Sequence, residues 1–241
     1  MNLKNMKIRL PMYFIGLFIM TIGIALSVKS NLGVSPVSSI PYTMTCIWGI
    51  EMGKATIIFH IVLVFIQFLL LRKNFKLITL LQIPVGVIFG YFTTFCNYLA
   101  SFFPTPDNLI VRILMVLASS VIVAVGIFLY LPADVIPLAG EGVMSAVSQV
   151  TKIEFSKIKM GFDITMVVVS AAACLIMIHS LGSVGAGTVI AAFLVGFILG
   201  IINKAFGKYR DKLLKKTPSV QVDEKTDDEQ NPTYVITVSR E

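Results

Sequence analysis

The chain has 241 residues, of which 56% are hydrophobic and 14% are charged, and its mean hydropathy is +0.86. This composition leaves too little polar surface to cover a soluble globule, so a soluble protein is excluded. The formal net charge of +7 does not indicate nucleic acid binding. Most Lys and Arg residues flank apolar segments, as they do in the cytoplasmic loops of membrane proteins.

Six apolar segments each approach the roughly 20 residues that a helix needs to cross a bilayer. They cover residues 10–27, 55–71, 77–103, 110–131, 160–178 and 184–203. A basic stretch precedes the first segment, as in signal peptides, but no small-residue cleavage site follows it, so we expect a mature helix. The three cysteines (Cys46, Cys96 and Cys174) lack metal-ligand spacing, and we expect no disulfide, metal site or cofactor.

The sequence contains two copies of one unit. Three stretches of the first copy recur in the second: 22–24 as 125–127, 53–61 as 156–164, and 83–90 as 193–200. Duplication within a membrane chain is typical of secondary transporters. We expect one repeat at 1–104, a second at 105–208, and a polar, disordered cytoplasmic tail at 209–241.

Positive charges predict the topology, because cytoplasmic loops collect Lys and Arg. They gather before the first span, between the second and third, before the fifth and after the sixth. Six spans place all four groups inside, with both termini cytoplasmic, if the segments at about 29–52 and 132–151 are re-entrant. An eight-span alternative puts Arg72 outside and needs spanning helices of only about 15 residues. The sequence therefore predicts an all-α fold of six transmembrane helices and two re-entrant half-helices, arranged as inverted-topology repeats.

The re-entrant segments indicate the substrate site. Each contains turn residues followed by a short helix, and half-helices that enter from opposite faces bring their N-termini together near the midplane. Helix N-termini favour anionic groups. The predicted substrate-binding residues are Ser35, Ser38, Ser39, Tyr42, Gly140, Glu141 and Ser145. The alternative is that both segments are connectors, each a loop followed by an interfacial helix.

Ionisable residues within membrane segments are functional candidates by default. We predict that Glu141, Asp163 and His60 couple transport to protons, because the repeat aligns His60 with Asp163. As alternatives, His60 is a hydrogen-bonded packing residue, and Asp163 caps its helix or pairs with Lys159. Other polar residues are expected mainly to join helices by hydrogen bonds. These are Gln67, Gln82, Asn97, Ser145, Ser148 and Gln149.

Several motifs together resemble the YczE/YyaS/YitT family of bacterial integral membrane proteins. They are the Asn-Leu-Gly-Val-Ser-Pro run at 31–36, Leu-Gln-Ile-Pro at 81–84, Pro-Leu-Ala-Gly-Glu-Gly at 137–142, and Phe162-Asp163. The likeness spans about residues 8–206. It implies a multi-pass protein of the bacterial cytoplasmic membrane and provides no catalytic residues. YitT-like members carry a small soluble domain, which the short polar tail here does not match.

These observations favour a transporter that moves a small polar or anionic solute by alternating access. A channel of the same architecture and a non-transporting membrane regulator or scaffold are the alternatives. We expect no enzymatic activity, because no nucleophile pair, paired aspartates or His-Glu metal cluster appears. The expected partners are the lipid bilayer and a small molecule or ion but no nucleic acid, and the glycine pairs at 86/90 and 196/200 would permit a homodimer.

Overall fold

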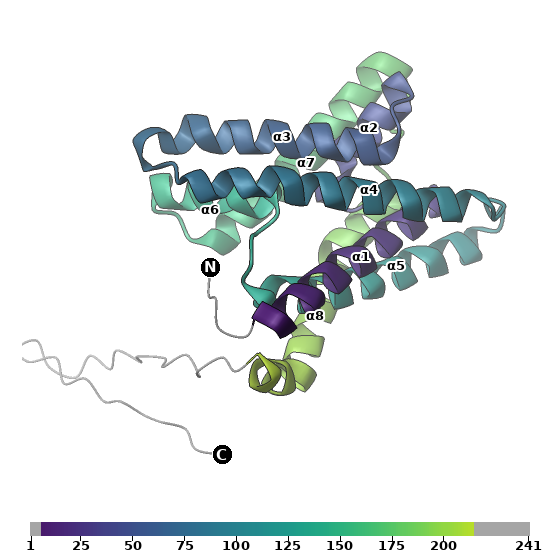
Figure 1. Ribbon diagram of the computed structural model, residues 1–241. Helices are drawn as coiled ribbons and strands as arrows, with labels where there is room; N and C mark the ends of the chain where they lie inside the picture. The colour runs from purple at the N-terminus through teal and green to yellow at the C-terminus, as the bar shows by residue number, and fades with distance from the viewer. Residues whose placement is uncertain (1–5, 215–241) are drawn as a thin grey trace, which may run out of the picture.

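The computed structural model describes residues 6–214, apart from the side chain of Ser156. Eight α-helices occur in this range (Figure 1): α1 Met6–Ser30, α2 Pro36–Trp48, α3 Met52–Leu71, α4 Gln82–Ser101, α5 Leu109–Tyr130, α6 Ala139–Thr151, α7 Phe155–Ile178 and α8 Ala186–Leu213. Three short 3-10 helices join them: η1 Arg72–Asn74, η2 Leu77–Leu81 and η3 Leu131–Ala133. The described residues contain no strand, and the predicted all-α fold is confirmed.

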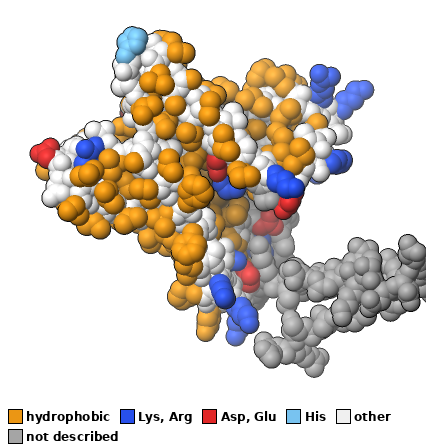
Figure 2. Space-filling model, turned by 180° about the vertical axis from the view of Figure 1, so that it is seen from behind, with side chains coloured by type: hydrophobic (Ala, Val, Ile, Leu, Met, Phe, Trp, Pro, Cys, Tyr) orange, Lys and Arg blue, Asp and Glu red, His pale blue; other side chains and the backbone are white. Residues whose placement is uncertain are grey.

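Six helices are long and apolar enough to cross a membrane, as predicted. With their 3-10 extensions they cover Met6–Ser30, Met52–Asn74, Leu77–Ser101, Leu109–Ala133, Lys157–Ile178 and Ala186–Leu213. Hydrophobic side chains cover most of the face seen in Figure 2, as expected of a surface in contact with lipid. The helix α8 continues to Leu213, beyond the predicted start of the tail at 209, and residues 215–241 lie outside the described residues.

The helices α2 and α6 have 13 residues each, too few to cross the hydrocarbon core. Pro36 begins α2 at a position where its missing N–H costs no helical hydrogen bond. Gly49 ends the same helix with a φ of +66° and donates its N–H to the carbonyl of Thr45. Lys152 ends α6 in the same left-handed conformation. Both short helices therefore have defined ends, and each is followed at once by a long helix.

Helix boundaries in the second half of the chain follow those in the first half. The helices α1, α2 and α3 start at residues 6, 36 and 52, while α5, α6 and α7 start at 109, 139 and 155. Each pair of starts is 103 residues apart, the spacing that separates the Gly23 and Gly126 motifs in the sequence. The short helix occupies the same place in each half, between the first and second long helices.

The helices α1 and α5 cross at glycines. A Cβ atom at Gly16 would lie 2.6 Å from the backbone nitrogen of Tyr130 and 2.8 Å from the carbonyl oxygen of Gly126. Further along, a Cβ at Gly23 would lie 3.0 Å from the carbonyl oxygen of Ser119. The contacting residue numbers on α5 decrease as those on α1 increase, so the two helices are antiparallel. Their backbones are in direct contact, as small residues allow inside membranes.

Most helix–helix contacts in one half of the chain have an equivalent contact when the two halves are exchanged. As α1 packs on α4, so α5 packs on α8; as α2 packs on α7, so α6 packs on α3; and α2–α3 corresponds to α6–α7. One pair breaks this pattern. The helices α3 and α4 run side by side (Figure 1), whereas α7 and α8 make at most marginal contact. The helices α3 and α4 are therefore packed together, whereas their counterparts α7 and α8 are not.

Candidate functional site

The N-terminal turns of the two short helices meet. A Cβ atom at Gly140, near the start of α6, would lie 3.7 Å from Val37 Cγ1, near the start of α2. Residues 37 and 140 are also separated by 103 positions, so the contact joins equivalent points of the two halves. The N-terminal ends of the two short helices, where the helix dipole is positive, therefore lie in one region of the interior.

The predicted serines on α2 bond mainly within the protein. Ser35 occupies the N-cap position but makes no capping bond, and its Oγ donates to Ser38 Oγ at 3.1 Å. Ser39 is fully buried and donates to the carbonyl of Pro36 at 2.6 Å. Tyr42 is half-buried and packs against the apolar core. These hydroxyl groups are near the meeting point of the half-helices, but Ser39 is sealed from solvent.

Glu141 stands in the first turn of α6, a helix outside the six membrane-spanning segments. Its Oε2 accepts a hydrogen bond from the N–H of Leu138 at 3.2 Å, and this N–H also contacts the Tyr130 hydroxyl at 3.1 Å. Burial raises the pKa of Glu141 to about 7, while the bond from Leu138 and the charge of Lys159 act in the opposite direction. The carboxyl group can therefore exchange a proton near neutral pH.

This shift makes the stability of the protein depend on pH. Because the folded state binds the Glu141 proton more tightly than the unfolded chain, stability should fall as the pH rises from about 4.5 to about 7. The slope is at most about 1.4 kcal/mol per pH unit. Thermal unfolding of Glu141→Gln should lose this component, whereas Glu51→Gln, which changes an exposed carboxylate at the start of α3, should keep it. Parallel pH profiles for the native protein and Glu141→Gln would contradict the assignment.

The structure does not bring the three predicted coupling residues into contact. His60 is buried, its ring stacks on Phe89 at 5.7 Å between centroids, and its Nδ1 has no hydrogen-bond partner in the described part of the chain. Asp163 pairs with Lys159 at 2.8 Å, the alternative considered from the sequence. No hydrogen bond or ion pair among the described residues joins either of them to Glu141, and proton coupling stays a prediction.

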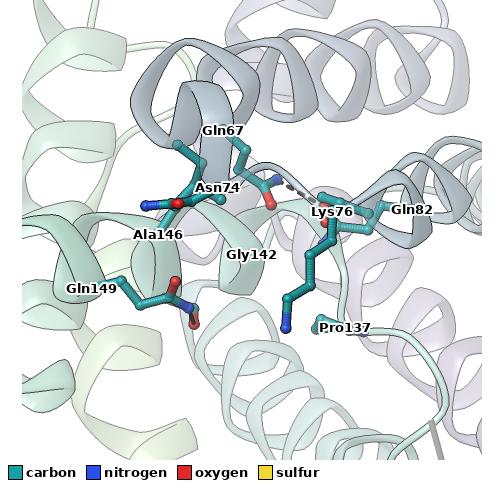
Figure 3. A pocket seen from close by; sticks show the side chains of 11 residues that line it. Gln67, Asn74, Lys76, Gln82, Pro137, Gly142, Ala146 and Gln149 are labelled. Atoms are coloured by element: carbon teal, nitrogen blue, oxygen red, sulfur yellow. Dashed lines mark hydrogen bonds between the residues drawn. The ribbon is translucent and has the colours of Figure 1, made fainter.

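A polar cavity of about 180 Å³ lies between α6 and the corner where α3 leads into α4 (Figure 3). The neutral polar residues that line it are Gln67, Asn74, Thr79, Gln82, Ser145 and Gln149. Lys76 is the only charged residue among the lining side chains, which include no carboxylate. In Figure 3, Lys76 and Gln149 lie on opposite sides of this space. The wall of the cavity is therefore hydrogen-bonding and weakly positive.

Two buried amides form the inner wall of the cavity. Gln67 and Gln82 are only 2% and 4% exposed, and Gln67 Nε2 donates to Gln82 Oε1 at 2.8 Å and to the carbonyl of Ala139 at 3.2 Å. The remaining amide atoms, Gln67 Oε1 and Gln82 Nε2, have no hydrogen-bond partner within residues 6–214. They provide one acceptor and one donor to whatever occupies the cavity.

Gly142 makes room for this amide pair. A Cβ atom at position 142 would collide with Gln67 Oε1 and would lie 2.6 Å from Gln82 Nε2. By contrast, a Cβ at Gly140 would make only an ordinary contact with Val37. The absence of a side chain at position 142 therefore leaves the space that the two amides occupy.

Of the residues predicted to bind substrate, only Ser145 lines this cavity, and its role as a site residue stays a prediction. Gln67 and Gln82 were lesser candidates expected mainly to join helices, and Asn74, Lys76 and Thr79 were not considered as site residues. The available signal was the pair of glutamines that flank the basic turn between two spans. The cavity itself arises when α6 docks against that turn, which no local pattern indicates.

Comparison with known proteins relates the chain to membrane proteins. Residues 7–204 match a family of unknown function, DUF6198. The chain is also similar to an uncharacterized membrane protein, YczE, of Bacillus subtilis (strain 168), with 24% identity over 197 residues that cover 81% of this chain and 86% of that protein. No solved structure matches. The predicted resemblance to YczE-like membrane proteins is confirmed.

Proposed function

The chain belongs to the DUF6198 family, and because that family has no assigned function, we propose one from the geometry of the site. The protein is a secondary transporter that moves a small polar or anionic solute across the bacterial cytoplasmic membrane by alternating access. The observation that carries this proposal is the polar cavity inside a membrane fold, with two buried amides aimed into it. The amide atoms that make no bond within residues 6–214, Gln67 Oε1 and Gln82 Nε2, line the cavity and offer a solute an acceptor and a donor.

The cavity wall defines the class of solute. Lys76 supplies the single charge, and the amide of Gln82 supplies a donor, which together suit a carboxylate or another small anion. Gln67 Oε1 supplies an acceptor for a hydroxyl, amine or amide group on the same molecule. We therefore propose an organic anion that also carries a hydrogen-bond donor, and whose size fits a cavity of about 180 Å³.

The arrangement of the two halves supports alternating access. Equal helix spacing, paired helix contacts and the contact between Val37 and Gly140 are features expected of inverted-topology repeats. The cavity lies beside the basic turn that contains Lys76, which the charge pattern assigns to the cytoplasmic face. In this proposal both termini are cytoplasmic and the cavity opens inward. Proton coupling through Glu141 is part of the proposal, since its pKa is near 7.

A thermal-shift screen in detergent tests this proposal. The purified protein is exposed to monocarboxylates, dicarboxylates, neutral and acidic amino acids, phosphate and sulfate at pH 5.5 and 7.5. A specific solute at 100 times its Kd should stabilise the folded state by about 2.7 kcal/mol, with a saturable dose response. The expected result is stabilisation by an organic anion but not by uncharged sugars. Silence across the panel would favour the non-transporting regulator or scaffold.

A further inference from the structure

The open cavity has a closed counterpart at the equivalent position in the other half of the chain. Shifting by 103 residues converts Gly142 into Ser39 and Gln67 into Ser170. Gly142 and Gln67 line the cavity, whereas Ser170 Oγ donates to Ser39 Oγ at 2.9 Å. The contact of α3 with α6 thus surrounds a space, and the equivalent contact of α7 with α2 is filled by a direct hydrogen bond.

Further hydroxyl groups extend this closed contact. Thr43, which corresponds to Ala146 of the cavity, lies with its Oγ1 2.6 Å from Ser183 Oγ. The thiol of Cys174 lies 3.8 Å from Thr43 Oγ1 and 3.6 Å from Ser183 Oγ. We call the set Ser39, Thr43, Ser170, Cys174 and Ser183 the hydroxyl cluster. All its members are buried, and they join α2 and α7 to the loop before α8.

The loops beside the hydroxyl cluster are also closed. Gly187 donates its N–H to the carbonyl of Leu32 at 2.8 Å, and Val34 donates to the carbonyl of Ser183 at 3.4 Å. Gly33 adopts a φ of +102°, and a Cβ there would lie 2.6 Å from the backbone of Gly185. On the cavity side, the equivalent loops contribute lining residues on either side of the space.

We propose that the hydroxyl cluster is the outer gate of the transport path, closed in the state described while the cytoplasmic cavity is open. This inference rests on the proposed transport function, because a gate requires a path. Alternating access by rocking of two repeats requires the two sides to exchange these states. Hydroxyl–hydroxyl bonds suit such a gate, since they break singly at small cost and water can replace them. Opening would separate α2 from α7 and release the loop bond between Leu32 and Gly187.

Cys174 provides a native reporter for this gate, since its thiol is buried in the closed cluster. In a variant that carries Cys46→Ser and Cys96→Ser, Cys174 is the sole cysteine. A membrane-impermeant maleimide is added to right-side-out vesicles that contain the full chain, and the labelling rate of Cys174 is measured. Thr43→Val keeps the shape but removes the bond to Ser183, so the rate should rise by about 3- to 10-fold, as expected for loss of one hydrogen bond. Thr43→Ser, which keeps the hydroxyl, should react like the native protein.

A second variant tests whether labelling of Cys174 reports exchange between the two sides or only a local fluctuation of the hydroxyl cluster. Ser145 lines the cavity and aligns with Tyr42 under the 103-residue shift. Ser145→Tyr places a larger side chain in the cavity, which should prevent the cavity from closing and so hold it in its open arrangement. Because the two sides exchange states, outside labelling of Cys174 should then fall several-fold. A rate unchanged by Ser145→Tyr, or equal rates for Thr43→Val and Thr43→Ser, would overturn the gate.

Solute binding by the same preparations distinguishes the two proposals. If an organic anion still stabilises the protein while labelling shows no gate, the gate inference fails and the cavity remains a binding site. If no anion stabilises the native protein, the proposed transport function fails first.

Discussion

Gly16→Val and Gly126→Val should each strongly destabilise the folded protein. A Cβ at Gly16 would lie 2.6 Å from the Tyr130 nitrogen, and a Cβ at Gly126 would collide with the Met20 side chain and lie 2.8 Å from the carbonyl oxygen of Gly16. A side chain at either position must therefore displace the backbone of the opposite helix. Backbone atoms cannot rotate away as side chains do, so α1 and α5 must separate along the seam that joins the two halves. Overpacking typically costs about 1–3 kcal/mol, and we expect at least the upper value here.

Gly200→Val is the matched control for this prediction. Its Cβ would meet nothing within 4 Å, so the same change in an apolar helix should leave the fold intact. Size-exclusion elution and thermal unfolding in detergent measure the outcome. Equal melting temperatures for Gly16→Val and Gly200→Val would show that the close crossing of α1 and α5 does not exist. The space beside Gly196 and Gly200 also leaves a homodimer through α8 as an untested prediction.

Gly142→Ala should weaken solute binding strongly while the protein stays folded. The added methyl group pushes apart the amides of Gln67 and Gln82, which are flexible enough to move but then lose their mutual bond. A solute that uses both amides would lose about 1–3 kcal/mol, which corresponds to roughly 10- to 100-fold weaker binding. The saturable thermal shift of the native protein provides the measurement.

Gly140→Ala makes the same chemical change two residues earlier on α6. There the Cβ would make only an ordinary 3.7 Å contact with Val37, so binding should be retained. If both variants bind the solute with native affinity, the amide pair is not part of the site. If both lose it, the defect belongs to α6 as a whole.

Much of the fold can be predicted from the sequence, because lipid imposes strong rules on length and charge. The six spans follow from the hydrophobic segments, and the short helices α2 and α6 follow from Pro36 and from the glycines around Glu141. The crossing of α1 and α5 was not predicted, since the repeated Gly23 and Gly126 motifs indicate equivalence and not contact. Contact depends on how the two halves dock, which a linear pattern does not contain.

The site was predicted less completely for the same reason. The substrate site was predicted on the polar residues of the two short helices, and of these Ser39 is bonded and buried. The accessible amide atoms belong to Gln67 and Gln82, which were expected mainly to join helices. In sequence, a glutamine that joins two helices looks the same as one that also faces a cavity. Only the position of Gly142 against both amides distinguishes them.

Transport itself is tested most directly by counterflow. Native protein is reconstituted into liposomes loaded with an excess of the organic anion that gives the strongest thermal shift, and entry of the labelled anion is followed. A transporter should give saturable, transient accumulation above the outside concentration, and this accumulation should be lost in Gly142→Ala but not in Gly140→Ala. Entry that does not saturate and only equilibrates would indicate a channel, and an absence of entry with folded, ligand-binding protein would contradict a transporter.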